Sequence, residues 1–169
     1  MQLTELFLEQ LESEAGLTRK VLQRVPDGHT QWKPHQKSML MGYLASLCAS
    51  MPGWVVPMVE WDELDITGAG GGEAFKPRDL ATSQALVEAL DDGVAKARKV
   101  LAGTTDAHLR KPWRLLLGGR VIDEKPRYVN LRDGLFSHLA HHRGQLTVYL
   151  RLNDAPVPAL YGPSADERV

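Results

Sequence analysis

Apolar residues recur at spacings of three and four along most of this chain, and this period constrains the fold more than any other feature of the sequence. The first such stripe consists of Leu3, Leu6, Phe7, Leu11, Leu17, Val21 and Leu22. An α-helix turns about 100° per residue, so residues at these spacings share one face. The pattern predicts a long first helix that ends at the turn residues Pro26, Asp27 and Gly28.

A second helix is predicted from about Met39 to about Met51, after a connector over residues 31–38 that ends in Ser38 as N-cap. Pro52 and Gly53 follow it directly. Because proline can also open a helical turn, we expect a kink there, or a short restart, with residues 54–61 continuing in helix at a changed angle.

Two more helices are predicted, one from after Pro77 to Gly103 and a last one from about Leu131 to Leu152. Between them, Gly118 and Gly119 separate two short apolar runs, which is typical of a hairpin or extended excursion between Trp113 and Tyr128. The tail from residue 156 onwards is rich in turn residues and is expected to lie irregularly over the helices.

A glycine-rich run, Gly68 and Gly70 to Gly72, is predicted to be a flexible loop. Neither a P-loop nor a dinucleotide-binding context surrounds it, so a phosphate site is not favoured. With four long helices in 169 residues, the chain is expected to form a single all-α domain over residues 1–169, a four-helix bundle with a short hairpin before the last helix.

Charge and composition argue against several classes of partner. Lysine and arginine number 20 against 21 acidic residues, and they are scattered, so nucleic-acid binding is not expected. We find no signal peptide in residues 1–10 and no segment long and apolar enough to span a membrane. Cys48 is the single cysteine, which suits a reducing compartment, and the expected location is the cytoplasm.

The chemistry of the sequence is concentrated in the last predicted helix, at His138 and His142. Residues four apart on a helix are displaced by only about 40° around its axis, so these imidazoles share one face. Imidazole is a ligand for Zn, Ni, Fe or Cu, and a catalytic zinc-type site uses three protein ligands and an open position. The pair predicts a divalent-metal site for which two protein ligands are available.

Other pairings are less well aligned. His138 with His141 is sterically possible but turns toward another side of the helix, and Asp133 is five residues before His138. Histidines near a helix C-terminus can also simply favour the helix dipole. The remaining histidines, His29, His35 and His108, lie in a connector or beside turns and are not expected to join the site.

Four sequence blocks resemble the DinB/YfiT-like family of metal-dependent proteins. They are Trp32-Lys33-Pro34-His35 with Lys37-Ser38-Met39, Leu44-Ala45 with Ala49 and Met51-Pro52-Gly53-Trp54, His138 with His142-Arg143-Gly144-Gln145-Leu146 and Tyr149-Leu150-Arg151, and the tail beginning Leu160-Tyr161-Gly162-Pro163. The blocks occur in the family's order and cover most of the chain.

This resemblance implies a four-helix bundle, often a homodimer, in which three histidines hold a divalent metal such as Zn, Ni or Fe. Two of the three carry over to His138 and His142. The third family position, five residues before Pro52, is Leu47 here. Leucine has no donor atom, so water, a carboxylate or substrate would have to complete the set. Cys48 adjoins the vacant position, but a rotation of about 100° should turn its side chain away.

Two functions follow as hypotheses. The first is a metal-dependent enzyme of thiol-transferase or hydrolase type acting with a small-molecule or low-molecular-weight thiol, because relatives in this family include thiol-dependent transferases and a mycothiol-dependent isomerase. The second is a non-catalytic, dimeric small-molecule-binding or stress-associated bundle that has lost the metal, with Leu47 drying the cavity. Arg143 and Gln145 are candidates for orienting the histidines, although Arg143 can also be a surface ion pair.

Overall fold

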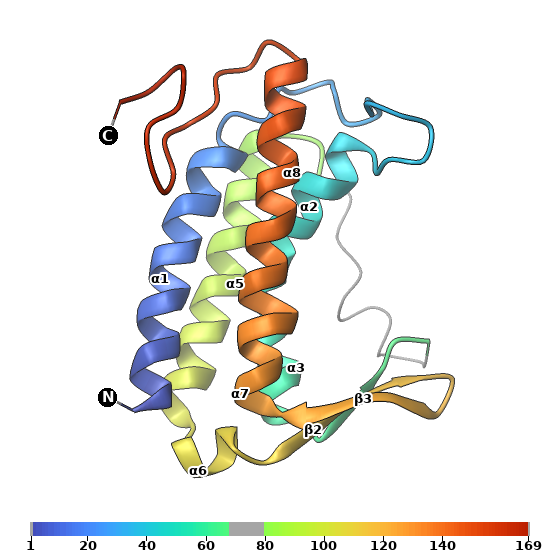
Figure 1. Cartoon of the computed structure of the whole chain (residues 1–169), viewed down its shortest axis with the longest axis vertical. Helices are drawn as coiled ribbons and strands as arrows, with labels where there is room; N and C mark the ends of the chain where they lie inside the picture. Colours follow the sequence, from blue (N-terminus) through green and yellow to red (C-terminus); the bar gives the residue numbers. More distant parts are fainter. Residues whose placement is uncertain (1, 68–79, 169) are drawn as a thin grey trace.

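The computed structural model describes residues 2–67 and 80–168, which form a helical bundle with a small sheet at one end (Figure 1). Its long helical segments are α1 (Leu3–Leu22), the run of α2 (Met41–Ser50), η1 (Met51–Trp54) and α3 (Val55–Glu60), then α5 (Ser83–Gly103), and finally the run of α7 (Arg127–Val129), η2 (Asn130–Ser137) and α8 (His138–Leu152). The short helix α6 (Asp106–Leu109) and the strands β1 (Glu63–Asp65), β2 (Pro112–Leu117) and β3 (Arg120–Pro126) lie at the lower end in Figure 1.

The fold is mostly helical but not all-α, so the expected fold class is corrected. The predicted hairpin is confirmed: β2 pairs antiparallel with β3 around the turn Gly118-Gly119, with a bulge between Leu115 and Leu116. The sequence did not predict β1, which pairs parallel with β2 and completes a three-stranded sheet. Three residues carry too little alternation to be detected as a strand.

The predicted break after the second helix is also confirmed. α2 passes into a 3-10 turn over Met51–Trp54, with Pro52 in its first positions, and α3 continues from Val55. α2 begins at Met41 with Leu40 at its N-cap, two residues later than predicted, and Ser38 does not cap it.

The third helix begins later than expected. Thr82 caps α5, its hydroxyl accepting from the Ala85 N–H at 3.2 Å, so Leu80 and Ala81 precede the helix. The start predicted just after Pro77 and the glycine-rich run lie outside the described residues.

The last helical segment differs from the sequence prediction in its first half. It begins at Arg127 rather than near Leu131, directly after Pro126, and residues Asn130–Ser137 are wound as a π-helix. After the short α-helical turn at Arg127–Val129, α-helix resumes at His138. Helical periodicity cannot distinguish these windings, because both place apolar residues on one broad face.

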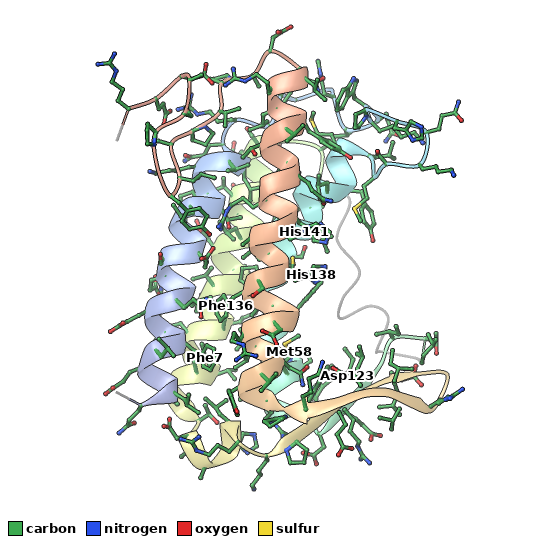
Figure 2. All side chains as sticks on the ribbon, viewed as in Figure 1. Phe7, Met58, Asp123, Phe136, His138 and His141 are labelled. Atoms are coloured by element: carbon green, nitrogen blue, oxygen red, sulfur yellow. The ribbon has the colours of Figure 1, made fainter. Side chains whose placement is uncertain are left out.

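One apolar cluster joins the helices. Phe7 of α1 stacks on Phe136 of η2 with ring centroids 5.9 Å apart (Figure 2). Side chains from α2 and α5, such as Leu44 and Leu90, are buried in the same cluster. At the surface, Arg19 of α1 pairs with Asp91 of α5, which adds a polar contact to the same helix pair.

The expectation that no segment is long and apolar enough to span a membrane is corrected by the stretch Met41–Glu60. By length and composition alone it qualifies as a membrane span, which the sequence analysis did not recognise. In the structure 78% of the apolar window is buried inside the bundle, as in the core helix of a soluble protein.

Gly42 is predicted to be required for the entry into α2. A Cβ atom at Gly42 would lie 2.8 Å from the Cβ of Thr30, and the Gly42 N–H donates to the Thr30 carbonyl at 3.0 Å. We expect Gly42→Ala to lower the free energy of unfolding by about 1–3 kcal/mol through overpacking. Gly16→Ala in α1 is the matched control, because open space surrounds Gly16, and should stabilise by about 0.5–1 kcal/mol. Chemical denaturation of both variants measures their free energies of unfolding. Equal changes in the two variants would contradict the requirement for glycine at position 42.

Asp65 fixes the hairpin turn to the end of β1. Its carboxylate accepts from the Thr67 N–H at 2.9 Å and from the N–H groups of Gly118 and Gly119 at 3.1 and 2.5 Å. These hydrogen bonds, with the Thr67 N–H contributing most, hold the pKa of Asp65 well below its usual range.

A pKa that is lower in the folded state contributes stability above the unfolded pKa, and that contribution is lost as the pH falls through the folded pKa. Below about pH 4, we expect the protection of the Gly118 and Gly119 amides against hydrogen exchange to decrease in the wild type. Asp65→Asn should lower their protection already at pH 7 and flatten this acid dependence. A wild-type profile as flat as that of the variant would show that the carboxylate does not hold the turn.

Candidate functional site

The two histidines predicted from the sequence do come together. Their Nε2 atoms are 2.8 Å apart, and the ring centroids 4.5 Å. Both residues lie in the first five positions of α8, so the α-helical spacing of four residues brings them onto one face. His142 is buried, with 6% of its surface exposed. Figure 2 shows His138 and His141 on the side of α8 away from α1, above the hairpin that carries Asp123.

Each imidazole also has a hydrogen-bond partner of its own. The Nδ1 of His142 lies 2.9 Å from the Oε1 of Gln145, one turn further along α8. His138 hydrogen-bonds to the backbone of Gly134, within the π-helical turn before it. An oxygen that accepts from Nδ1–H fixes the tautomer in which Nε2 carries a lone pair, and metal-binding histidines are commonly held this way.

The two histidines present facing Nε2 atoms. At 2.8 Å these nitrogens are joined either by a hydrogen bond, in which one neutral ring donates its N–H and the other accepts, or by a shared cation. Desolvation is the largest cause that lowers the pKa of His138, followed by the neighbouring His142, so the charged imidazolium form of His138 is disfavoured. The geometry is compatible with a shared cation as well as with a hydrogen bond between two neutral rings.

Trp54 and the π-helical turn complete the described surroundings. The Trp54 ring lies 6.0 Å from His138, so the exit of the second helix and the start of α8 meet here. Gly134 provides the backbone that binds His138, and a Cβ there would lie 3.7 Å from the Cε of Met58. Local periodicity predicts neither contact, because one depends on how Trp54 of η1 packs against α8 and the other on how Met58 of α3 packs against η2. π-Helical turns are frequent beside functional sites.

A three-residue ligand set does not fit the described residues. Across residues 2–67 and 80–168, no three His, Cys, Asp or Glu side chains are grouped so that they could hold a metal ion. Leu47, at the family's third position, is buried with 6% exposure. Cys48 is fully buried, and desolvation raises the pKa of its thiol to about 12, which disfavours the thiolate that binds metals. A two-imidazole site fits; a three-histidine site does not.

His29, His35 and His108 form hydrogen bonds away from His138 and His142, as expected. His29 Nδ1 contacts Asn153 Oδ1 at 2.9 Å, His35 Nδ1 accepts from the Lys37 N–H, and His108 Nε2 lies 2.7 Å from the Val59 carbonyl oxygen. Asp133 pairs with Arg132 beside it, at 2.7 Å. His141 is exposed, and its ring centroid is 5.1 Å from that of His142.

Arg143 and Gln145 contact different parts of the structure. Gln145 contacts His142, in agreement with the prediction that it orients the site. Arg143 is 1% exposed, and its guanidinium donates to the Glu14 carboxylate at 2.6 Å, to Thr18 Oγ1 at 3.0 Å and to the Tyr161 hydroxyl. It is thus neither a surface ion pair nor a contact of the histidines; it ties α8 to α1 and to the C-terminal tail.

Comparison with known proteins identifies the fold. No protein-family model and no curated protein sequence matches the chain. Solved structures do match, among them two of DinB-like proteins. The one from Bacillus cereus ATCC 10987 has a TM-score of 0.68 and 18% identity, over 92% of this chain and 95% of its own. The one from Bacillus subtilis, YjoA, has a TM-score of 0.66 and 17% identity, over 90% and 94%.

Removal of Arg143 should destabilise the fold strongly. In Arg143→Leu the Glu14 carboxylate, 13% exposed, loses its buried cation, and we expect a loss of about 3 kcal/mol in the free energy of unfolding. Arg151→Leu makes the same chemical change at a half-exposed pair with Asp166 and should cost less than about 1 kcal/mol. Urea denaturation compares the two; a similar cost for both would mean that Arg143 is not a structural anchor.

Proposed function

We propose that this chain, which has the fold of the DinB-like proteins, binds one divalent metal ion through His138 and His142 and acts as a thiol-dependent transferase or a hydrolase. The proposal rests on a single observation, the 2.8 Å approach of two Nε2 atoms. The Nδ1 of His142 contacts Gln145, and the backbone of Gly134 hydrogen-bonds to His138.

The separation of the two atoms agrees with coordination of one ion. Zn, Ni and Fe all accept imidazole nitrogen, so His138 and His142 would hold such an ion through the two Nε2 atoms that lie 2.8 Å apart. The remaining positions would be left to solvent or to a substrate.

A divalent ion held there would polarise a carbonyl group or lower the pKa of a bound water or thiol. The chain itself contributes orientation. Gln145 holds the His142 ring through Nδ1, which would reduce the reorganisation needed on binding. Trp54 provides an apolar ring next to His138 and Leu47 a buried apolar side chain at the family's third position.

A second function is favoured by Leu47. A buried leucine in place of the third ligand supports a non-catalytic, homodimeric bundle that has given up the metal and keeps a dry pocket for an apolar small molecule. Metal content separates this non-catalytic module from the enzyme.

Metal stoichiometry is therefore the test of the proposed function. Elemental mass spectrometry on protein purified without an affinity tag should find close to one divalent metal ion per chain in the wild type, and loss of that metal in His138→Ala and in His142→Ala. His35→Ala is the matched control, because His35 lies in the exposed connector. Metal in the wild type that survives both site substitutions would contradict the proposal.

Two further variants test how the site is built. Gln145→Leu should weaken metal binding by about 10–100-fold, as loss of an orienting partner does, with little change in stability because Gln145 is exposed. Leu47→His should strengthen it by supplying a third imidazole. Metal that is absent from the wild type and present in Leu47→His would instead support the non-catalytic module.

A further inference from the structure

A second concave surface lies where α3, the end of α5 and α6 meet. It encloses about 850 Å³, within the range of small-molecule sites. Figure 1 shows α6 at the lower end of the bundle, below the end of α5. We refer to this surface as the α3–α5–α6 groove; nothing in the proposed function uses it.

The groove combines an apolar floor with a polar rim. Val56 and Val59 of α3 and Val100 of α5 provide the hydrocarbon surface. Lys96 and Lys99 contribute ammonium groups from α5, and Thr104 and Thr105 add hydroxyl groups where α5 ends.

The two lysines differ in how their charge is compensated. Lys96 Nζ lies 2.6 Å from the Asp92 carboxylate, one turn earlier on α5. Lys99 forms no ion pair within the described part of the chain, so its ammonium group remains available to a ligand. The opposite wall carries a carboxylate, Glu60 of α3, which would repel a second negative charge on that ligand.

The walls are held in place without a ligand. The Nε2 of His108 in α6 lies 2.7 Å from the Val59 carbonyl oxygen and links α6 to α3. The Thr105 hydroxyl accepts from the His108 N–H at 3.2 Å, and its own proton stays free to be donated. A preformed site binds at a lower entropic cost than one that must be assembled.

From this geometry we propose that the α3–α5–α6 groove binds a small organic monoanion with an apolar body, of the monocarboxylate class. The hydrocarbon part covers the valines, and the carboxylate accepts from Lys99 and the threonine hydroxyls. Glu60 selects against dianions of the same length.

The test uses octanoate as the probe, with octan-1-ol as its neutral analogue and octanedioate as its dianion, in ¹H–¹⁵N NMR titrations of the full chain. Octanoate is expected to give saturable shifts at the amides of Val59, Val100 and Thr104, with octan-1-ol and octanedioate binding more weakly. Shifts that do not saturate, that lie elsewhere, or that are equal for octanoate and octan-1-ol would overturn the proposal.

Charge variants give an independent readout. Lys99→Gln should weaken octanoate binding by about threefold, the size expected for a partly exposed charge pair. Lys37→Gln, in the exposed connector at the other end of the bundle, removes the same charge and should leave binding unchanged. Glu60→Gln should strengthen octanoate binding and reduce the discrimination against octanedioate. Equal effects of Lys99→Gln and Lys37→Gln would show that the groove does not bind the carboxylate.

Discussion

A buried guanidinium group must find partners for its charge and its donors, and in this fold Arg143 meets that demand through α1 and the C-terminal tail. The contact fixes the rotation of α8 about its own axis. Because neighbouring residues differ by about 100° around a helix, holding Arg143 against α1 directs His142 to another side. The orientation of the candidate site is thus set by an ion pair that takes no part in it.

The π-helical turn has the complementary effect on His138. Residues Asn130–Ser137 are wound more widely than an α-helix, and α-helix resumes at His138 itself. The backbone of Gly134, inside that turn, hydrogen-bonds to the His138 ring. The buried Arg143 and the π-helical turn therefore act together to bring the two imidazoles to a separation that suits one cation.

Much of the fold and of the candidate site was predictable from the sequence, and the features that were not predicted have physical reasons. The spacing of His138 and His142 predicted their shared face because four residues nearly complete a helical turn. The hairpin followed from Gly118-Gly119, and the break in the second helix from Pro52. The features that were missed include β1, the π-helical turn and the burial of Arg143. β1 and the burial of Arg143 depend on contacts between segments far apart in the chain, such as Arg143 with Glu14, which local periodicity does not encode. The π-helical turn was missed because its apolar residues share one broad face, as they do in an α-helix.

The central claim is that two imidazoles, both through Nε2, form one divalent-metal site. Proton NMR of the cobalt(II)-loaded protein tests it most directly, because each Nε2-coordinated histidine keeps an exchangeable Nδ1–H whose resonance the paramagnetic ion shifts far downfield. We predict two such resonances, both lost in D₂O, and the loss of both in His138→Ala together with the ion. No shifted exchangeable resonance, or three of them, would contradict this account of the site.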